Sequence, residues 1–327
     1  MPPVPRHHFG SGSRRPSLRS RVATAAVREL VRPALRHVPI SPLAIRVGGL
    51  VDLGARMLPV RTPVRVEAVT RESVRCEIVR AAGVPDGFGA GAVLYFHGGG
   101  FVAGGLHTHR RFVAELSRAT GLPVVQVRYR YLPEATVPES VRDCLAAYRW
   151  LLEHGADSES VVFAGDSAGG FLTMSTALAV GGEQLPAPAA VVAISPWLDL
   201  DLDAKLAHRN AMTEAYLPTA AFTRIAELGC TRDGRIDTRL SPVNGDLSVL
   251  PSTLLTACDD EFLRLDSDVM AAALDAAGVR CELHIWYGQI HAFPVVFPYL
   301  PESRQLTAEI ARFIREHVRS AASSAAA

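Results

Sequence analysis

The sequence predicts an α/β fold in which a mostly parallel sheet carries helices on both faces. Short runs rich in valine, isoleucine and leucine alternate along the chain with longer segments of helical periodicity, and this alternation is typical of parallel sheets. The chain has 327 residues and is 48% hydrophobic, so it can bury a large core. We therefore expect one enlarged domain, or one domain with a lid.

The predicted strands are of two kinds. The first two, at 64–69 and 73–79, alternate apolar and polar residues, as antiparallel edge strands with one solvated face do. The others are more continuously apolar, as strands in the interior of a parallel sheet are. They span residues 92–96, 124–127, 161–164, 190–194, 253–257 and 283–286.

Helices are predicted between and after these strands. The best-marked helix begins at Pro138, because proline suits the first turn of a helix. Its apolar stripe consists of Val141, Leu145, Tyr148 and Leu152. The five predicted helices span residues 109–120, 138–154, 168–180, 263–277 and 303–319.

Two segments outside this alternation predict a helical cap over the carboxyl edge of the sheet. Residues 1–60 form the N-terminal cap segment, of which about the first 15 are expected to be disordered, and residues 198–237 form a cap insertion. The core then comprises residues 61–197 and 238–320. A Ser/Ala tail at 321–327 is expected to be disordered.

Residues 19–38 predict an amphipathic helix with two competing placements. The helix packs over the functional edge of the sheet, or it lies as a basic helix on an anionic membrane surface. We expect the first, because Pro33 interrupts the pattern and tryptophan or phenylalanine anchors are absent. The apolar stripe consists of Val22, Ala26, Leu30, Ala34 and Val38, with Arg21, Arg28, Arg32 and Arg36 largely off it.

Composition argues against several classes of protein. A net charge of +1 implies neither nucleic-acid binding nor a strongly acidic ligand. The five cysteines lack C-x-x-C or zinc spacing, which argues against disulfides and structural metal and for a reducing compartment. No run of about 18 apolar residues predicts a transmembrane helix, and no apolar stretch marks a signal peptide. We expect a cytoplasmic protein without cofactor or metal, leave cell-envelope association open, and attribute the single lysine, Lys205, to compositional bias.

One serine stands in a sharp turn between a strand and a helix. Gly165-Asp166-Ser167-Ala168-Gly169 joins the predicted strand at 161–164 to the predicted helix at 168–180. G-x-S-x-G in this context is typical of a nucleophile elbow, in which glycines avoid clashes and the helix N-terminus favours negative charge. We predict that Ser167 is a nucleophile; the alternative is a chance glycine-serine turn.

A glycine-rich loop follows the strand at 92–96. His97-Gly98-Gly99-Gly100 matches the oxyanion-hole loop of lipases and esterases, which pairs with the amide of the residue after the nucleophile, here Ala168. The alternatives are a flexible turn or a phosphate cradle, but the Lys-Ser/Thr pair of a phosphate loop is missing. His97 itself is expected to hold the loop by hydrogen bonding.

The candidate base and acid lie late in the chain. His291, in the loop after the last predicted strand, satisfies the order serine, acid, histidine, whereas His284 lies within that strand and is expected to be packed. The acid follows the preceding strand, where Asp259, Asp260 and Glu261 are adjacent. An aspartate or a glutamate can accept the imidazole Nδ1 proton, so backbone position decides between them.

Five blocks of the sequence stand in an order found in one enzyme family. They are His97-Gly98-Gly99-Gly100, Tyr129-Arg130-Tyr131-Leu132-Pro133-Glu134, Gly165-Asp166-Ser167-Ala168-Gly169-Gly170, Ser195-Pro196-Trp197-Leu198-Asp199 and Gly288-x-x-His291-x-Phe293. From Val93 to the C-terminal helix, the chain resembles the hormone-sensitive lipase-like branch of the α/β-hydrolases. The resemblance implies the α/β-hydrolase fold, a lid built from the N-terminal segment and an insertion, and serine carboxylesterase activity on short- to medium-chain esters.

The resemblance also implies roles at the matching positions. Ser167 would be the nucleophile and His291 the base. The amides of Gly99, Gly100 and Ala168 would form the oxyanion hole.

The acid is the main departure from the family pattern. The family carries a sequence like Asp-Pro-Leu-Arg-Asp, and the register of Leu263-Arg264 places Glu261 where the first aspartate stands. Asp260 and Asp259 stay alternatives. Two lesser departures touch no catalytic atom. The chain has Tyr131-Leu132 for the usual Leu-Ala, and it has Ala292 where glycine commonly follows the histidine.

The sequence leaves other functions open. One alternative is a non-catalytic small-ligand receptor like the plant gibberellin receptors, which resemble this family but lack the histidine that corresponds to His291. Another is hydrolysis of an amide or a thioester, which would use the same residues. The expected partner is a small-molecule ester and not nucleic acid, with peripheral membrane contact through the N-terminal segment and a homodimer left open. Lid residues would line an acyl pocket or form the lid's own core: Leu43, Leu50, Met57, Met212, Tyr216, Leu217 and Phe222.

Overall fold

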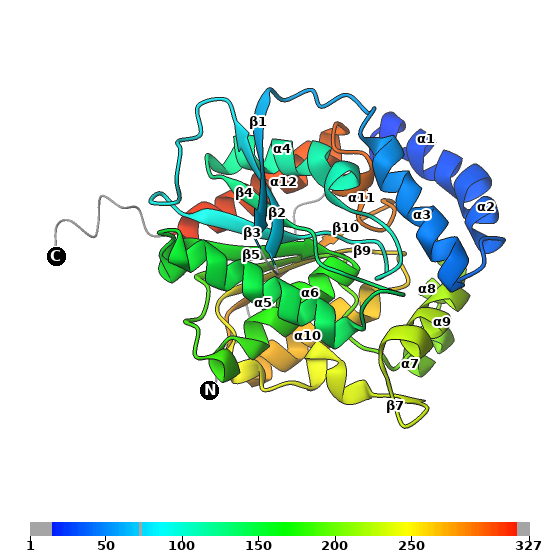
Figure 1. The fold of residues 1–327 in the computed structure, drawn as a ribbon. Helices are drawn as coiled ribbons and strands as arrows, with labels where there is room; N and C mark the ends of the chain where they lie inside the picture. The colour runs from blue at the N-terminus through cyan, green and yellow to red at the C-terminus, as the bar shows by residue number, and fades with distance from the viewer. Residues whose placement is uncertain (1–14, 72–73, 319–327) are drawn as a thin grey trace, which may run out of the picture.

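An eight-stranded sheet forms the centre of the protein, and helices cover both of its faces (Figure 1). The computed structural model describes residues 15–71 and 74–318. Six neighbouring strands are parallel, and the two strands at one edge of the sheet pair with each other in antiparallel fashion, which confirms the predicted fold. In spatial order the strands are β1 (Val64–Arg71), β2 (Val74–Ala81), β4 (Val124–Val127), β3 (Ala92–Phe96), β5 (Val161–Asp166), β6 (Ala190–Ile194), β9 (Thr253–Cys258) and β10 (Cys281–Trp286).

The five predicted helices pack in two layers against this sheet. One layer contains α4 (Leu106–Thr120) and α12 (Pro301–His317), and the other contains α5 (Val137–Glu153), α6 (Ala168–Ala179) and α10 (Arg264–Ala276). Helices on both faces leave the inner strands dry, which explains their continuously apolar sequences.

Helix α4 begins three residues before the predicted start because a distant residue caps it. Asp52 of α3 (Pro42–Ala55) accepts hydrogen bonds from the amides of His107 and Thr108, at 3.0 and 2.8 Å. The first-turn amides of a helix have no partner within the helix, so this carboxylate extends α4 and ties α3 to it.

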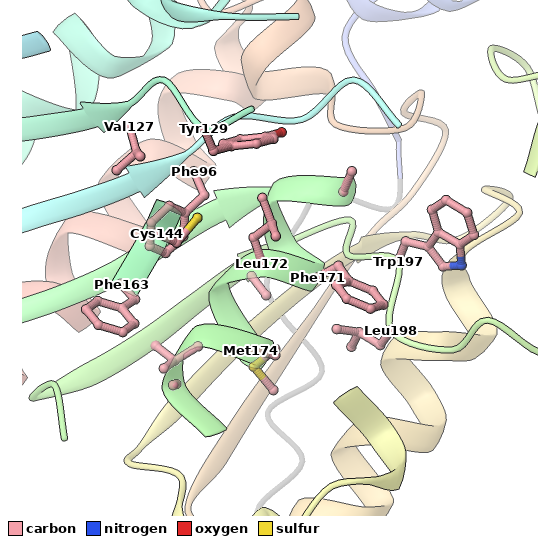
Figure 2. Close-up of a cluster of buried hydrophobic side chains, with 14 of the residues drawn as sticks. Phe96, Val127, Tyr129, Cys144, Phe163, Phe171, Leu172, Met174, Trp197 and Leu198 are labelled. Atoms are coloured by element: carbon pink, nitrogen blue, oxygen red, sulfur yellow. The ribbon is translucent and has the colours of Figure 1, made fainter. Parts of the chain in front are cut away.

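Aromatic side chains fill the core on the α5–α6 face of the sheet (Figure 2). Phe163 of β5 makes edge-to-face contacts with Phe96 and Tyr148, with ring centroids 5.8 and 4.7 Å apart. Phe171 of α6 contacts Phe101 in the same way at 5.6 Å. Such pairs contribute about 0.5–1.5 kcal/mol beyond their buried area, so they hold β5 and α6 firmly around the turn that joins them.

Helices of the N-terminal segment and of the insertion lie on the same side of the molecule (Figure 1). One hydrogen bond of 3.4 Å, from the Arg28 guanidinium to the Thr213 carbonyl, links them directly. The boundaries of cap and core stay predictions, and most of the predicted disordered first 15 residues and the whole tail at 321–327 lie outside the described residues. The elements are α1 (Leu18–Ala26), a π-helical turn (Val27–Val31), α2 (Arg32–Arg36) and α3, then α7 (Asp203–Ala207), α8 (Asn210–Thr213), α9 (Thr219–Gly229), β7 (Thr231–Arg232) and β8 (Arg235–Ile236).

The N-terminal helix differs from the prediction in two ways. Pro33 does not end it, because the helix passes through the π-helical turn at Val27–Val31 and continues into α2, whose first turn holds the proline. The predicted apolar stripe also faces solvent, with Val22 and Leu30 exposed to 61% and 72%. No helix within residues 15–71 and 74–318 is long and apolar enough to cross a membrane.

Lys205, the single lysine, forms a buried ion pair that the sequence analysis did not anticipate. Its ammonium donates to Asp266 and to the Asp199 carbonyl, both at 2.6 Å, and the side chains of the pair are 2% exposed. The Asp266 carboxylate also accepts from the amides of Leu198 and Asp199. Burial raises the pKa of Asp266 to about 6 although Lys205 and these amides oppose the rise. The pair therefore anchors α7, in the insertion, to α10 of the core.

We expect Lys205→Met to lower the free energy of unfolding by about 3–5 kcal/mol at neutral pH, because it leaves Asp266 buried without a counter-ion. Without the lysine the pKa of Asp266 rises further, so the loss should shrink as falling pH protonates this carboxyl in the folded state. Urea unfolding across the pH range measures this. Arg224→Met, which removes a cation from the exposed pair with Glu227, is the control and should change stability far less. Equal losses for the two variants would contradict the prediction.

Candidate active site

Ser167 lies between the end of β5 and the start of α6 in a strained backbone conformation. Its φ of 54° and ψ of −120° are unusual for a residue with a side chain. The surrounding chain holds this geometry from both sides. The Ser167 amide donates to the Ile194 carbonyl at 2.9 Å, and its carbonyl accepts from the amides of Phe171 and Trp197, both at 3.1 Å.

Two glycines allow the chain to approach itself closely at this turn. A Cβ at Gly165 would lie 2.5 Å from Thr173 Oγ1, and a Cβ at Gly169 would overlap the Phe96 carbonyl. Side chains at these positions would push α6 away from β3 and β5. The G-x-S-x-G spacing therefore has the steric cause that the sequence analysis assigned to it.

His291 and Glu261 form a buried hydrogen-bonded pair. His291 lies in the loop after β10, and its Nδ1 donates to Glu261 Oε2 at 2.9 Å. The other oxygen of Glu261 accepts from the Cys258 amide at 3.0 Å, which fixes the carboxylate. Burial lowers the pKa of His291, but the hydrogen bond and charge of Glu261 outweigh it, so the net shift is upward. With Nδ1 donating to Glu261, the neutral imidazole keeps Nε2 as a proton acceptor.

The other two candidate acids have different surroundings. Asp259 Oδ1 accepts from the Gly288 amide at 2.9 Å and so holds the start of the loop that carries His291. The Asp260 side chain forms no hydrogen bond or ion pair with the described residues. Only the Glu261 carboxylate, of the three, lies within hydrogen-bond distance of His291 among the described residues. His284 is buried in β10, where its Nδ1 lies 2.9 Å from Glu309, so it is packed as predicted.

The end of β6 and the segment after it contact both loops: Ile194 and Trp197 hydrogen-bond the Ser167 backbone, and Ser195 contacts the loop that carries His291. Ser195 Oγ accepts from the Ala292 amide at 3.1 Å, and its own amide donates to the Thr256 carbonyl at 2.6 Å. Within the described chain no hydrogen bond joins Ser167 Oγ to His291 directly. Such bonds commonly tighten only when substrate is bound. This role of Ser195 was not predicted from the sequence, and its positive φ of 45° is visible only in the structure.

The glycine-rich loop after β3 faces the same turn. Gly99 and Gly100 both have positive φ, at 120° and 63°, and the Gly99 carbonyl accepts from the amides of Val102 and Ala103. A Cβ at Gly99 would overlap the Ala103 carbonyl. Ala168 is the first residue of α6, where amides have no intrahelical acceptor.

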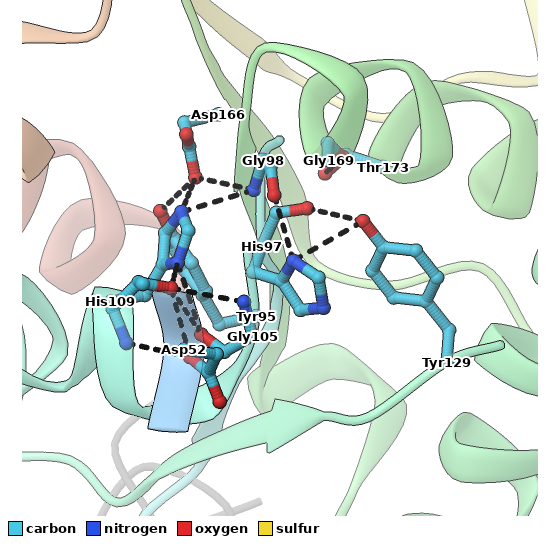
Figure 3. Close-up of polar contacts among 11 residues, drawn as sticks. Asp52, Tyr95, His97, Gly98, Gly105, His109, Tyr129, Asp166, Gly169 and Thr173 are labelled. Carbon is cyan, nitrogen blue, oxygen red and sulfur yellow. Dashed lines mark hydrogen bonds and ion pairs between the residues drawn. The ribbon is translucent and has the colours of Figure 1, made fainter. Parts of the chain in front are cut away.

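A buried polar network holds this loop against the nucleophile turn (Figure 3). The Asp166 carboxylate accepts from the Tyr95 hydroxyl at 2.6 Å and the Gly98 amide at 3.0 Å, and lies 3.3 Å from His109 Nε2. Burial opposes ionisation of Asp166, but His109 and Tyr95 prevail and lower its pKa. The same pair affects His109. Burial lowers the pKa of His109, but the charge and hydrogen bond of Asp166 outweigh burial, so its net shift is upward.

His97 hydrogen-bonds within the loop, as predicted. Its Nδ1 donates to the Gly98 carbonyl at 2.8 Å, and its own carbonyl accepts from the Tyr129 hydroxyl at 2.6 Å. The imidazole stacks on the Tyr129 ring at 4.3 Å. Burial, and then the neighbouring His109, lower the pKa of His97 to about 4, so His97 is neutral near pH 7.

Residues of the insertion hold Glu261 in place, a role that was not predicted from the sequence. Glu214 is buried, and its carboxylate accepts from the Phe262 amide at 2.8 Å and from the Tyr216 amide at 2.6 Å. Asn210 Nδ2 donates to the Glu261 carbonyl at 2.9 Å. These contacts clamp the loop of Glu261 from the cap side. The contacts to Phe262 and Glu261 join residues about 50 positions apart in the sequence, so no local pattern could have predicted them.

The arrangement offers a serine hydroxyl, an imidazole backed by a carboxylate, and free amides at a helix start. This set can transfer an acyl group. In the described part of the chain, no group of three or more His, Cys, Asp or Glu side chains is placed to hold a metal ion.

Comparisons with known proteins identify the family. The model of a family with the α/β-hydrolase fold matches residues 93–295. Esterase LipU of Mycobacterium tuberculosis is 39% identical over 296 residues, covering 88% of this chain and 98% of the relative. Carboxylesterase/phospholipase LipF of the same organism is 37% identical and covers 92% of this chain and 82% of the relative.

Solved structures agree with these relatives. A mutant of the esterase E40 superposes with a TM-score of 0.83 at 31% identity, covering 93% of this chain and 100% of that one. An esterase from the bacterial hormone-sensitive lipase family superposes with a TM-score of 0.81 at 30% identity, covering 93% and 99%. The chain therefore belongs to the α/β-hydrolases and, within them, to the hormone-sensitive lipase-like esterases.

Proposed function

We propose that this esterase is a serine carboxylesterase that hydrolyses short- to medium-chain esters, with Ser167 as nucleophile, His291 as base and Glu261 as its acid. The observation that carries the proposal is the buried Glu261–His291 pair, with 2.9 Å between Glu261 Oε2 and His291 Nδ1. Ser195 holds the loop of His291, and its neighbours Ile194 and Trp197 hold the strained turn of Ser167. A receptor role on the same fold would not need this pair.

Acylation begins with attack of Ser167 Oγ on the ester carbonyl carbon. His291 Nε2 takes the hydroxyl proton, and Glu261 stabilises the imidazolium that forms. The upward pKa shift of His291 favours this proton transfer. Amides of Gly99, Gly100 and Ala168 bind the developing oxyanion, each contributing about 3 kcal/mol in the transition state.

The remaining steps return the enzyme to its starting state. The imidazolium of His291 gives its proton to the leaving alcohol oxygen, and the bond from the acyl carbon to this oxygen breaks. Water then attacks the acyl-enzyme while His291 takes its proton. Ser167 Oγ leaves the acyl carbon, recovers the proton, and the carboxylic acid departs.

The cap limits the space around the reacting carbonyl, which supports a preference for short acyl chains. Ile225 of α9 approaches the oxyanion loop so closely that a Cβ at Gly100 would lie 3.2 Å from its Cδ1. Phe222 of the same helix packs on Trp197 and Phe262, with both centroid distances at 5.0 Å. Leu43, Leu50, Met57 and Met212 are exposed and neither line this region nor form the core of the lid.

We expect kcat/KM on p-nitrophenyl esters to peak at short or medium acyl chains and to fall by about tenfold or more for palmitate. Ile225→Ala removes side-chain volume above the oxyanion loop and should move the optimum to longer chains. Met212→Ala, on the exposed side of the cap, is the control and should leave the profile unchanged. A profile that Ile225→Ala does not move would show that α9 does not limit the acyl group.

A further inference from the structure

The N-terminal helices carry most of the exposed large apolar side chains of the described residues. Of 16 such side chains, 11 lie between Leu18 and Leu58. The most exposed are Leu18 at 71%, Leu30 at 72%, Leu43 at 73% and Met57 at 85%. Exposed apolar groups on soluble proteins are usually scattered, so this concentration marks an interaction surface.

Helix α3 turns its apolar stripe away from the protein. Leu43 and Leu50 are spaced by seven residues, which places them on one face of α3, and the exposed Met57 lies in the turn just after the helix. The protein side of α3 is instead held by the buried Ile45 and by Asp52, which caps α4. These side chains therefore contribute little to packing against the rest of the described residues.

Helix α1 is likewise attached to the protein by its inner side and exposed on its outer side. Polar contacts attach its inner side: the Ser20 hydroxyl donates to Gln289 at 2.6 Å and the Thr24 hydroxyl donates to the Gly288 carbonyl at 3.2 Å. Leu18 and Val22 remain exposed. We call the exposed side chains Leu18, Val22, Leu30, Leu43, Leu50 and Met57 the cap face.

The charge of this segment is opposite in sign to that of the rest of the protein. Residues 15–61 contain nine arginines and two acids, a net charge of +7, whereas residues 62–327 carry a net charge of −8. Five arginines beside the cap face are exposed and have no ion pair or side-chain hydrogen bond with the described residues: Arg19, Arg21, Arg36, Arg46 and Arg56.

We propose that the cap face docks on an anionic lipid bilayer. Apolar side chains enter the interface between headgroups and acyl chains, while the surrounding arginines neutralise anionic headgroups. A nucleic acid would engage the arginines but leave the apolar stripe in water. A second copy that docked face to face through the same segment would bring two segments of charge +7 together, and their repulsion disfavours that arrangement.

Docking in this orientation turns the catalytic edge toward the lipid. The inner side of α1 contacts Gly288 and Gln289, next to His291, and Asp52 of α3 holds the helix that follows the oxyanion loop. Esters dissolved in the bilayer then reach the site without crossing bulk water. This consequence rests on the proposed ester hydrolysis; the docking itself does not.

The test is sedimentation of the full chain with vesicles of phosphatidylcholine, with and without phosphatidylglycerol, at low and high salt. One variant removes four charges: Arg19, Arg36, Arg46 and Arg56, each to Gln. Its control removes four exposed arginines elsewhere: Arg71, Arg75, Arg128 and Arg304, each to Gln. A second variant changes Leu43, Leu50 and Met57 to Gln, and its control changes Val66, Val249 and Val269 to Gln.

We expect the wild type to bind vesicles containing phosphatidylglycerol and to be released by salt. The cap-arginine variant should bind by about two to three orders of magnitude more weakly, whereas its control keeps most of the affinity. The apolar variant should also lose binding, even at low salt. All four variants should keep the thermal unfolding temperature of the wild type and its turnover of a water-soluble ester, because the substituted side chains are exposed and lie outside the proposed active site.

Several results would overturn the proposal. Wild type that fails to sediment with anionic vesicles, or cap variants that bind as well as their controls, would exclude docking through this face. Binding to duplex DNA without binding to vesicles would assign the arginines to nucleic acid. A dimer that the apolar variant alone disrupts would assign the cap face to self-association. Ser167→Ala should bind vesicles like the wild type, so docking and ester hydrolysis can fail separately.

Discussion

Ser167→Ala is expected to reduce kcat for p-nitrophenyl butyrate by about 10⁵- to 10⁶-fold, the loss expected when the nucleophile of such a triad is removed. Alanine can form no acyl-enzyme, and the amides of Gly99, Gly100 and Ala168 can supply only the residual rate. Steady-state kinetics measure the loss of turnover, and mass spectrometry after treatment with an organophosphate detects the covalent adduct. Wild type should gain one covalent adduct per chain, and the variant none.

Ser175→Ala is the matched control for this substitution. Ser175 lies on the same helix, two turns beyond the nucleophile, and lines a cavity of about 750 Å³ between α5, α6 and residues 239–249. Turnover and labelling should stay at the wild-type level. A Ser167→Ala protein that still hydrolyses esters and is still labelled would remove Ser167 from the mechanism.

Glu261→Gln is expected to lower kcat by about 10³- to 10⁴-fold, because an amide can hold the imidazole in the wrong tautomer and cannot stabilise the imidazolium. Asp260→Asn is the control, since the Asp260 side chain has no hydrogen bond or ion pair in the described structure. It should retain nearly wild-type turnover. A large loss in Asp260→Asn together with an active Glu261→Gln would assign the acid to Asp260.

The residual activity of Glu261→Gln should also respond differently to pH. The neutral imidazole is the active base, so activity falls as pH drops through the pKa of His291. Glu261 raises that pKa, chiefly through its hydrogen bond and charge acting against burial. Removing the charge should therefore move the acidic limb of kcat/KM to lower pH. An unshifted limb would show that another group controls it.

Local sequence patterns were sufficient to predict the strands, the five core helices and the strained turn at Ser167. Alternating polarity marks β1 and β2, continuous apolar runs mark the buried strands, and Gly165 and Gly169 reflect a clash that any side chain would make. These features depend on residues a few positions apart, and backbone geometry imposes the same spacing in every chain.

Contacts between residues that are far apart in the sequence could not be predicted from local patterns, because they depend on how the whole chain packs. The sequence placed Asp259, Asp260 and Glu261 together but left open which acid meets His291, because that depends on the path of the loop after β9. It marked an apolar stripe at 19–38 but not that polar contacts to Gly288 and Gln289 would turn the stripe outward. It likewise left the partner of Lys205 unknown.

Local patterns in the sequence were thus enough to predict the topology, the strained turn at Ser167 and the small set of residues from which we propose a triad. The tertiary structure decided which acid pairs with His291, which residues clamp it, and which side of the cap faces solvent. The physical reason is that periodicity and turn chemistry act over one or two turns of chain. Hydrogen bonds such as Glu214 to Phe262 join segments whose separation in space is set by the packing of the whole core.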